Sequence, residues 1–453
     1  MKSINPFTGK VISEYPEHSG PEVENIIGNV YSDWKSWKET SYRSRADLMK
    51  RAAQNLRDKK DHYGRIMTME MGKLLRESMA EVEKCAWVCD YYADHAGEML
   101  KDEVIVTDAT RSFVAFQPIG VVLAVMPWNF PFWQVFRFAA PALMAGNAAV
   151  LKHASNVPGC ALAIEEIFRE AGFPENLFRT LMIPSPGVEA VISNPLIAAV
   201  TLTGSEAAGS HVASLAGRFL KKTVLELGGA DPFIVLDDAD LDAAVKTAVT
   251  ARMLNQGQSC IAAKRFIVMK QVMQQFESAL KAEFEALRMG DPMDPATQVG
   301  PLARPDLVDE IERQVNGSVA SGARLITGGH RPDKVGCYFE PTILADVCKG
   351  MPVYSKETFG PVISLITADD EEEAIRIAND SDFGLGGCVW TRDLARGEKV
   401  ARKIETGAMF VNGMTKSDPR LPFGGIKKSG YGRELASYGI KEFVNIKTIW
   451  IGG

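Results

Sequence analysis

The hydrophobic and polar positions divide the chain into a helical first part and a longer part in which strands and helices alternate. Residues 20–100 carry long runs with charged residues on one side, a pattern typical of amphipathic helices. Near-continuous apolar runs then predict buried strands at 119–126, 148–152, 177–183, 198–203 and 223–227. The segments between these strands read as helices, at 133–146, 156–172, 188–194 and 206–217. This alternation predicts an α/β fold with a parallel sheet covered on both faces.

A second strand–helix series runs from 232 to about 430 and predicts a second α/β domain. Two β-rich segments, 111–118 and 441–451, fit neither domain. Left alone they would be hydrophobic edges, so pairing with another subunit is the economical explanation. We therefore expect a homodimer or a homotetramer.

The composition changes this picture little. The chain has 453 residues, 46% hydrophobic and 24% charged, with a net charge of -6, which argues against a nucleic-acid binder. The N-terminus lacks the apolar core of a signal peptide, and the apolar stretch 130–151 is interrupted by Arg137, Pro141 and Asn147. We expect a soluble, cytoplasmic protein with reduced cysteines, no membrane span and no metal site.

Cys260 lies in a polar turn, "NQGQSCIAAKRF", that contains Gly257. Structural cysteines usually lie within apolar runs, whereas this one lies where the backbone can approach a ligand. Cys260 is therefore a candidate nucleophile, and the alternative is an ordinary loop thiol.

Three further candidates stand at the carboxyl ends of predicted strands, where α/β proteins bind ligands. Asn129 can donate to an oxyanion, or it can be a turn residue that caps the next helix. Thr203, Gly204 and Ser205 open a helix whose N-terminus suits a pyrophosphate, or they form an ordinary N-cap; the GxGxxG fingerprint is absent. Glu226 is either a general base with a pKa raised by burial or a salt-bridged structural residue.

Together these motifs resemble the aldehyde dehydrogenase superfamily. The resemblance covers nearly the whole chain and rests on "PWNFP", "LTGS", "ELGG", "GQSC", "KETFGP" and "PFGGIKKSGYGRE", in the family's order and spacing. Within the superfamily the chain is most similar to the succinate-semialdehyde dehydrogenases. The resemblance implies the α/β aldehyde dehydrogenase fold. Its parts would be a Rossmann-like cofactor domain (1–110 and 119–227), an α/β catalytic domain (228–430) and a β oligomerisation flap (111–118 and 431–453).

The resemblance also implies roles for single residues. Cys260 matches the nucleophile, Glu226 the general base and Asn129 the oxyanion asparagine. The matches to cofactor-binding positions are Pro127, Trp128, Lys152, Ser155, Thr203, Gly204, Ser205, Leu227, Glu357 and Phe359. The implied reaction is NAD(P)-dependent oxidation of succinate semialdehyde to succinate. It would pass through a thiohemiacetal and a thioester at Cys260, which water activated by Glu226 hydrolyses.

The substrate positions are Trp133, Arg137 and Ser417. Arg137 lies about two helical turns after Asn129 and matches an arginine that holds the distal carboxylate of a semialdehyde. The alternative for Arg137 is a surface or interdomain salt bridge. Some relatives carry a second arginine where this chain has Leu254, which leaves room for glutarate semialdehyde or small uncharged aldehydes.

The cofactor depends on "LKHASNVP". NAD-preferring relatives usually have a glutamate at the position of Ser155. A serine there removes the repulsion of a 2′-phosphate, and Lys152 is close in sequence, so we expect NADP to be preferred and NAD to be the other acceptor. Two alternatives stay open: a CoA-acylating dehydrogenase, and a binding protein that has lost catalysis.

Overall fold

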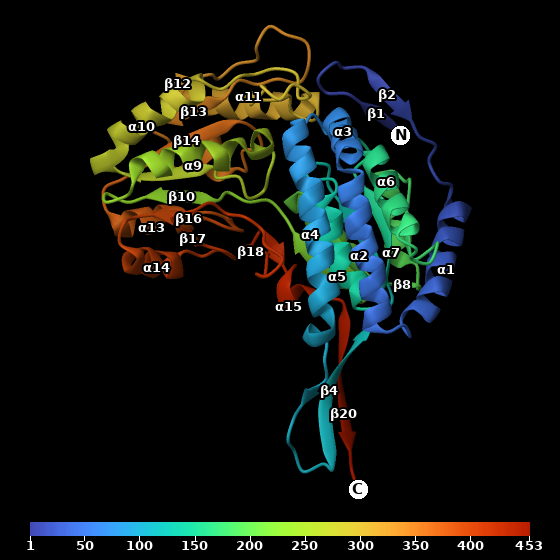
Figure 1. Cartoon of the computed structure of the whole chain (residues 1–453). Coiled ribbons are helices and arrows are strands. Elements are labelled where there is room, and N and C mark those ends of the chain that lie inside the picture. The colour runs from blue at the N-terminus through green and yellow to red at the C-terminus, as the bar shows by residue number, and fades with distance from the viewer.

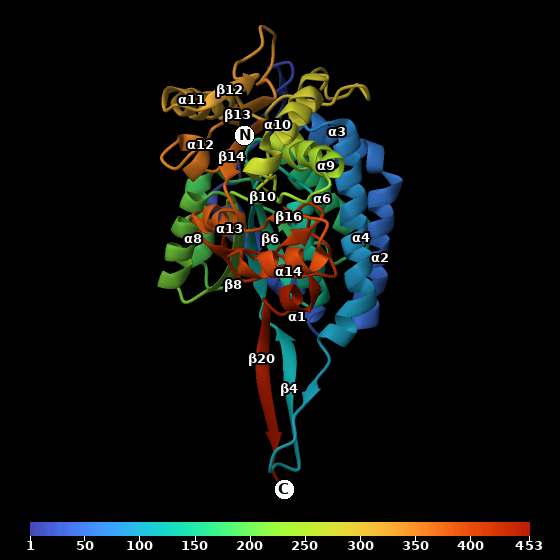
Figure 2. The same ribbon diagram turned by 90° about the vertical axis from the view of Figure 1, so that its left-hand side faces the viewer.

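The computed structural model describes all residues from 1 to 453. Two α/β units lie next to each other, and a narrow antiparallel ribbon projects from below them (Figure 1). The C-terminus lies at the tip of this ribbon, far from the N-terminus, and the view turned by 90° shows the same projection (Figure 2).

The first sheet contains the strands that the apolar runs predict. Its order is β19 (Gly430–Tyr431), β9 (Lys222–Glu226), β8 (Ile197–Thr203), β5 (Val121–Met126), β6 (Ala148–His153) and β7 (Phe178–Thr180). All neighbours are parallel except β19, which runs antiparallel to β9. The strand order reverses between β5 and β8, and ligands bind at such a switch point in open α/β sheets.

The second sheet has seven strands. Their order is β12 (Arg324–Thr327), β13 (Thr342–Ala345), β14 (Val362–Ala368), β11 (Arg265–Met269), β10 (Pro232–Val235), β16 (Cys388–Trp390) and β17 (Phe410–Val411). Only β12 is antiparallel to its neighbour. Separate hydrophobic clusters contain Ile234 and Ile267 on one side and Phe233 and Phe266 on the other, so both faces of this sheet are buried.

Helices cover both sheets. Their bounds are α1 (Gly20–Trp37), α2 (Tyr42–Asp58), α3 (Lys60–Met71), α4 (Leu75–Met99), α5 (Trp133–Met144), α6 (Pro158–Glu170), α7 (Val188–Ser193), α8 (Glu206–Arg218), α9 (Leu241–Met253), α10 (Lys270–Glu285), α11 (Pro305–Ala320), α12 (Pro352–Ser355), α13 (Glu371–Asn379), α14 (Leu394–Lys403) and α15 (Ala436–Ile440). The helices α1 to α4 share one hydrophobic core with the first sheet. None of the helices combines the length and the apolar character that crossing a membrane requires.

The ribbon corrects one expectation. The segments β4 (Arg111–Pro118) and β20 (Val444–Ile451) pair with each other over eight residue pairs, and β3 (Glu103–Val104) covers the other edge of β4. We expected both segments to pair with another subunit. This is wrong for the edges at which β4 and β20 pair with each other. Residues 441–443, predicted as strand, form a turn.

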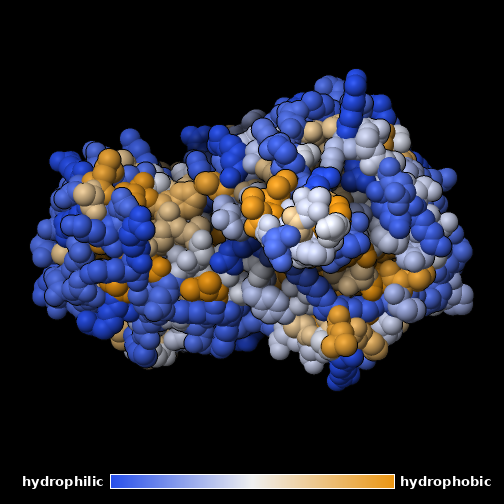
Figure 3. All heavy atoms as spheres, turned by 90° about the horizontal axis from the view of Figure 1, so that it is seen from below, coloured by the Kyte–Doolittle hydropathy of each residue, from blue (hydrophilic) through white to orange (hydrophobic).

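The eight-residue strand β20 is an outer strand of the ribbon, whose order is β20–β4–β3, so its far edge has no partner within the chain. Apolar side chains of β20 are exposed, among them Ile446 and Trp450. Seen from below, orange apolar side chains interrupt the blue surface (Figure 3). Two short antiparallel pairs complete the strands: β1 (Lys2–Ile4) with β2 (Val11–Glu14), and β15 (Phe383–Gly384) with β18 (Ile426–Lys427).

We propose the following domains: a cofactor-binding domain of residues 1–110 and 119–227, a catalytic domain of residues 228–430, and an oligomerisation flap of residues 111–118 and 431–453.

Candidate active site

Two cavities meet at Cys260, which is the one residue that lines both. One, of about 320 Å³, lies at the switch point of the first sheet. The other, of about 200 Å³, lies between α4, α5 and the loops around residues 254 and 415. A thiol at this junction can contact ligands from both sides.

The larger cavity gathers most of the predicted cofactor positions. Thr203, Gly204 and Ser205 follow β8, and the Ser205 hydroxyl accepts a hydrogen bond from the Ala208 N–H at the start of α8 (3.3 Å). The rings of Trp128 and Phe359 meet edge to face, with centroids 5.8 Å apart. The predicted residues that line this cavity are Pro127, Trp128, Asn129, Thr203, Gly204, Ser205, Leu227, Glu357 and Phe359, together with Cys260.

Two predicted cofactor positions, Lys152 and Ser155, lie outside that lining. Lys152, the penultimate residue of β6, is a buried ammonium that donates to the Ser185 hydroxyl (3.4 Å) and has no carboxylate within ion-pair distance. Burial lowers the pKa of Lys152, and Ser155 is exposed. A helix N-terminus, two aromatic rings and an uncompensated cation suit an anionic dinucleotide, so the residues fit such a cofactor.

The turn before Cys260 has an unusual backbone. Asn255 (φ 52°), Gln256 (φ 55°) and Gly257 (φ 75°) are all left-handed, and all three are buried. A Cβ at position 257 would lie 2.1 Å from the Gly360 carbonyl oxygen, so only glycine fits there. The Glu77 carboxylate accepts from the Asn255 N–H (3.1 Å), which ties the turn to α4. Strain of this kind is typical of functional sites.

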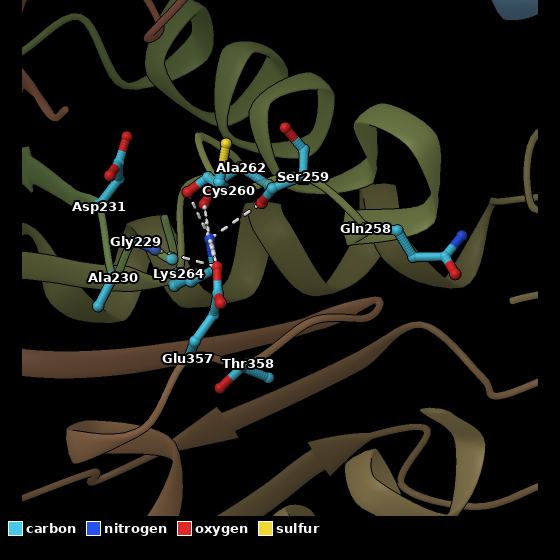
Figure 4. A network of polar contacts seen from close by, with 12 residues as sticks. Gly229, Ala230, Asp231, Gln258, Ser259, Cys260, Ala262, Lys264, Glu357 and Thr358 are labelled. Atoms are coloured by element: carbon cyan, nitrogen blue, oxygen red, sulfur yellow. Dashed lines mark hydrogen bonds and ion pairs between the residues drawn. The ribbon is translucent and has the colours of Figure 1, made fainter. Parts of the chain in front are cut away.

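Lys264 holds the turn from the other side (Figure 4). Its ammonium donates to the carbonyls of Ser259 (3.0 Å), Cys260 (2.8 Å) and Ala262 (3.1 Å). It also lies 3.6 Å from the Glu357 carboxylate, which accepts from the Gly229 N–H (3.0 Å). Because the carbonyls point to Lys264, the N–H of Cys260 is left without a partner in the protein.

Asn129 is oriented by the same turn. Its side-chain N–H₂ donates to the backbone carbonyl of Gln258 (3.1 Å). Its backbone carbonyl accepts from the side-chain N–H₂ of Asn255 (2.7 Å). An amide nitrogen carries two hydrogens, so one N–H of Asn129 stays available for a ligand.

Glu226 ends β9 and is 2% exposed. Neither of its oxygens has a hydrogen-bond partner, and it lines neither cavity. Burial, followed by the charge of Glu434, raises the pKa of Glu226 to about 8. A Cβ at Gly424 would lie 2.7 Å from one of its oxygens, so this glycine leaves room for the carboxylate. A buried carboxyl with a near-neutral pKa and no structural salt bridge suits a general base.

The smaller cavity contains all three predicted substrate residues, Trp133, Arg137 and Ser417. Arg137 is 2% exposed, forms an ion pair with Glu434 and lies 4.7 Å from the centre of the Phe423 ring. Glu434 therefore compensates part of the Arg137 charge within the protein. A salt bridge was the alternative role considered for Arg137 in the sequence analysis.

Known proteins resemble this chain over its whole length. The aldehyde dehydrogenase family matches residues 1–449. This chain belongs to the aldehyde dehydrogenase family. A probable succinate-semialdehyde dehydrogenase (NADP⁺) of Synechocystis sp. is 54% identical over 451 residues, which cover 100% of this chain and 99% of that relative. A succinate-semialdehyde dehydrogenase (NADP⁺) of Mycobacterium avium is 50% identical, and the match covers 100% of this chain and 97% of that relative. The crystal structure of succinic semialdehyde dehydrogenase from Streptococcus pyogenes in complex with NADP⁺ superposes with a TM-score of 0.98 at 41% identity, covering 100% of both chains.

Some residues of this aldehyde dehydrogenase site were not predicted. Arg304 and Leu307 line the cofactor side, and the Arg304 guanidinium lies 5.4 Å from the Trp128 ring centre. On the substrate side, Glu77, Glu81 and Lys84 project from α4. Their spacing repeats with the period of a helix face, and neighbours on that face such as Cys85 and Val88 are buried. The sequence did contain a signal for these three residues of α4, because they are charged and lie on a helical face whose other residues are apolar.

The thiol of this aldehyde dehydrogenase chain is not ionised by its surroundings alone. Burial, with the charges of Glu357 and Glu226, raises the pKa of Cys260 to about 12 against the opposing effect of Arg137 and Lys264. Without cofactor, the rate of Cys260 alkylation by iodoacetamide should therefore rise about tenfold per pH unit from pH ~7 to ~10. Mass spectrometry of the labelled peptide would measure this rate, and added aldehyde should block it.

Cys260→Ala gives the background labelling of the other cysteines. A plateau of the Cys260 rate near pH ~8.5, the ordinary value for a thiol, would contradict the effect of burial.

Proposed function

We propose that this protein oxidises succinate semialdehyde to succinate with NADP⁺ as the hydride acceptor. The observation that carries the proposal is the position of Cys260 between a cavity suited to a dinucleotide and one containing Arg137 and Ser417. The names of the relatives, succinate-semialdehyde dehydrogenases (NADP⁺), support the same substrate and cofactor. Glutarate semialdehyde is the second candidate, because Leu254 replaces one expected arginine.

The first half of the reaction forms a thioester at Cys260. The Cys260 thiol releases its proton to water and attacks the aldehyde carbon. The charge of Glu226 raises the pKa of this thiol, so we assign Glu226 to the second half of the reaction. The free N–H of Asn129 and the free N–H of Cys260 then stabilise the oxyanion. When bound, the nicotinamide supplies the acceptor for the hydride that leaves the same carbon. Glu357 and Phe359 line the cavity on that side.

The second half releases the acid. Glu226 takes a proton from water, which attacks the thioester and regenerates the Cys260 thiol. The buried, unpartnered carboxylate favours water over CoA as the acyl acceptor. Formation of acyl-CoA on adding CoA would favour a CoA-acylating enzyme instead.

We also propose that the free edge of β20 pairs with another copy of this chain. The unpaired edge and the exposed Ile446 and Trp450 support a dimer or a tetramer.

Cofactor choice tests the proposal directly. With succinate semialdehyde, the increase in absorbance at 340 nm should give a higher kcat/KM for NADP⁺ than for NAD⁺. Ser155→Glu should lower kcat/KM for NADP⁺ by roughly 10- to 100-fold and leave NAD⁺ little changed, because a carboxylate repels the 2′-phosphate. Ser155→Ala, which adds no charge, is the matched control and should lose only several-fold. Equal use of the two cofactors by the unmodified protein would contradict the assignment.

A further inference from the structure

One face of α4 forms a polar wall of the substrate-side cavity. Two of its carboxylates already have partners in the protein. Glu81 accepts from the N–H groups of Phe132 and Trp133 at the start of α5 (2.9 Å each) and forms a buried ion pair with Lys73. Glu77 accepts from the turn that carries the nucleophile. These two residues position α5 and the turn.

Lys84, one turn further along this face, has no such partner. Its ammonium donates to the Ser417 hydroxyl (2.7 Å) and lies 4.2 Å from the centre of the Trp133 ring. No carboxylate lies within ion-pair distance of it, although most lysines and arginines around it have one. Lys84 is half-buried, and ammonium groups withdrawn from water seldom lack a counter-ion, because the charge loses hydration.

The surroundings of Lys84 favour an incoming anion. Burial, and after it the charge of Arg137 on α5, lower the pKa of Lys84 to about 8, although Cys85, Glu81 and Asp418 act in the opposite direction. At neutral pH the group is still charged. A carboxylate that enters the cavity would meet an ammonium with two free N–H donors and a Ser417 hydroxyl whose own hydrogen is free.

Arg137 is a weaker anchor alone, because Glu434 already compensates its guanidinium. Leu254, where some relatives carry a second arginine, lines the same cavity as an apolar wall. We propose that Lys84, from α4, supplies this second cation and binds the distal carboxylate of the substrate together with Ser417 and Arg137. This inference rests on the proposed function and makes Lys84 a specificity-determining residue for short aldehydes with a terminal carboxylate.

The test compares succinate semialdehyde with butanal, which has the same chain length and no carboxylate. Lys84→Met should raise KM for succinate semialdehyde roughly 10- to 100-fold, the loss expected for hydrogen bonds to a charged group, with kcat changed less than about threefold. For butanal, the kcat and KM of Lys84→Met should each change less than about twofold. Lys84→Arg should recover part of the lost affinity.

Lys416→Met is the matched control, because it removes the same charge at the exposed rim of the same cavity. Solvent screening should limit its effect to about threefold. Equal losses with both aldehydes in Lys84→Met would assign Lys84 a structural role and overturn the inference. If the unmodified protein does not prefer succinate semialdehyde to butanal, the proposed function itself is wrong. If it does and Lys84→Met keeps that preference, only the role of Lys84 is wrong.

A second readout does not depend on turnover or on the stability of one variant. Succinate, the product, should raise the pKa of Lys84 on binding, so calorimetry near pH 8.5 in buffers of different ionisation enthalpy should detect proton uptake. The measurement belongs in a Glu226→Gln background, because Glu226 also titrates near pH 8. Uptake that persists in Lys84→Met or in Lys84→Gln would contradict the proposal.

Discussion

Replacing Cys260 with alanine is expected to lower kcat for aldehyde oxidation by roughly 10⁴-fold or more, because no other group can form the thioester. Cys260 is the one residue common to both cavities, and its turn is fixed by Lys264 and by the left-handed backbone at Gly257. The change removes only the sulfur atom, so the fold should survive it.

The measurement is absorbance at 340 nm with succinate semialdehyde and NADP⁺. Thermal unfolding should give the same Tm as the unmodified protein within a few degrees. Cys348→Ala, at an exposed cysteine, is the control and should keep full activity. Turnover retained in Cys260→Ala would rule out the thioester mechanism.

Replacing Glu226 with glutamine is expected to stop the second half of the reaction and spare the formation of the thioester. Glutamine has the same shape but cannot accept a proton from water. Steady-state kcat should fall by roughly 10²- to 10⁴-fold. An initial burst of NADPH should persist, and mass spectrometry should show an acyl adduct on Cys260.

The pH profile tests the same carboxyl. Since the pKa of Glu226 is about 8, its basic form predominates above that pH, and deacylation should rise as the pH increases through 8. This inflection should disappear in Glu226→Gln. Glu405→Gln, at an exposed carboxylate, is the control and should keep both the inflection and the rate. A Glu226→Gln profile with an unchanged rate and no adduct would remove Glu226 from the role of base.

The sequence predicted the five parallel strands of the first sheet and the groups that follow them, but not the antiparallel β19. Runs such as "VVLAVM" and "IAAVTLT" are almost entirely apolar because both faces of a parallel sheet are buried. This pattern also places Asn129 and Ser205 after the ends of β5 and β8. Once the two strands are neighbours, these groups must lie at one edge. The two strands that flank the switch point could therefore be predicted from the local sequence pattern.

The β ribbon shows the limit of the same reasoning. Two hydrophobic edge segments were visible at 111–118 and 441–451, but alternation of residues does not say which strand is the partner. The chain brings β4 and β20 together over a long separation in sequence, and this settles one edge of each. Long-range pairing depends on tertiary packing.

The sequence by itself determined the family, the α/β fold and the chemical groups of the site, because each depends on local pattern or on a short motif. Only the tertiary structure decided how those groups are compensated. It pairs Arg137 with Glu434, leaves Glu226 without a partner and places Lys84, from a distant helix, beside Ser417 without a counter-ion. Burial and charge at these points come from residues far apart in the chain. For this reason the pKa values of Cys260, Glu226 and Lys84, and with them the reactivity and specificity of the site, depend on the folded arrangement.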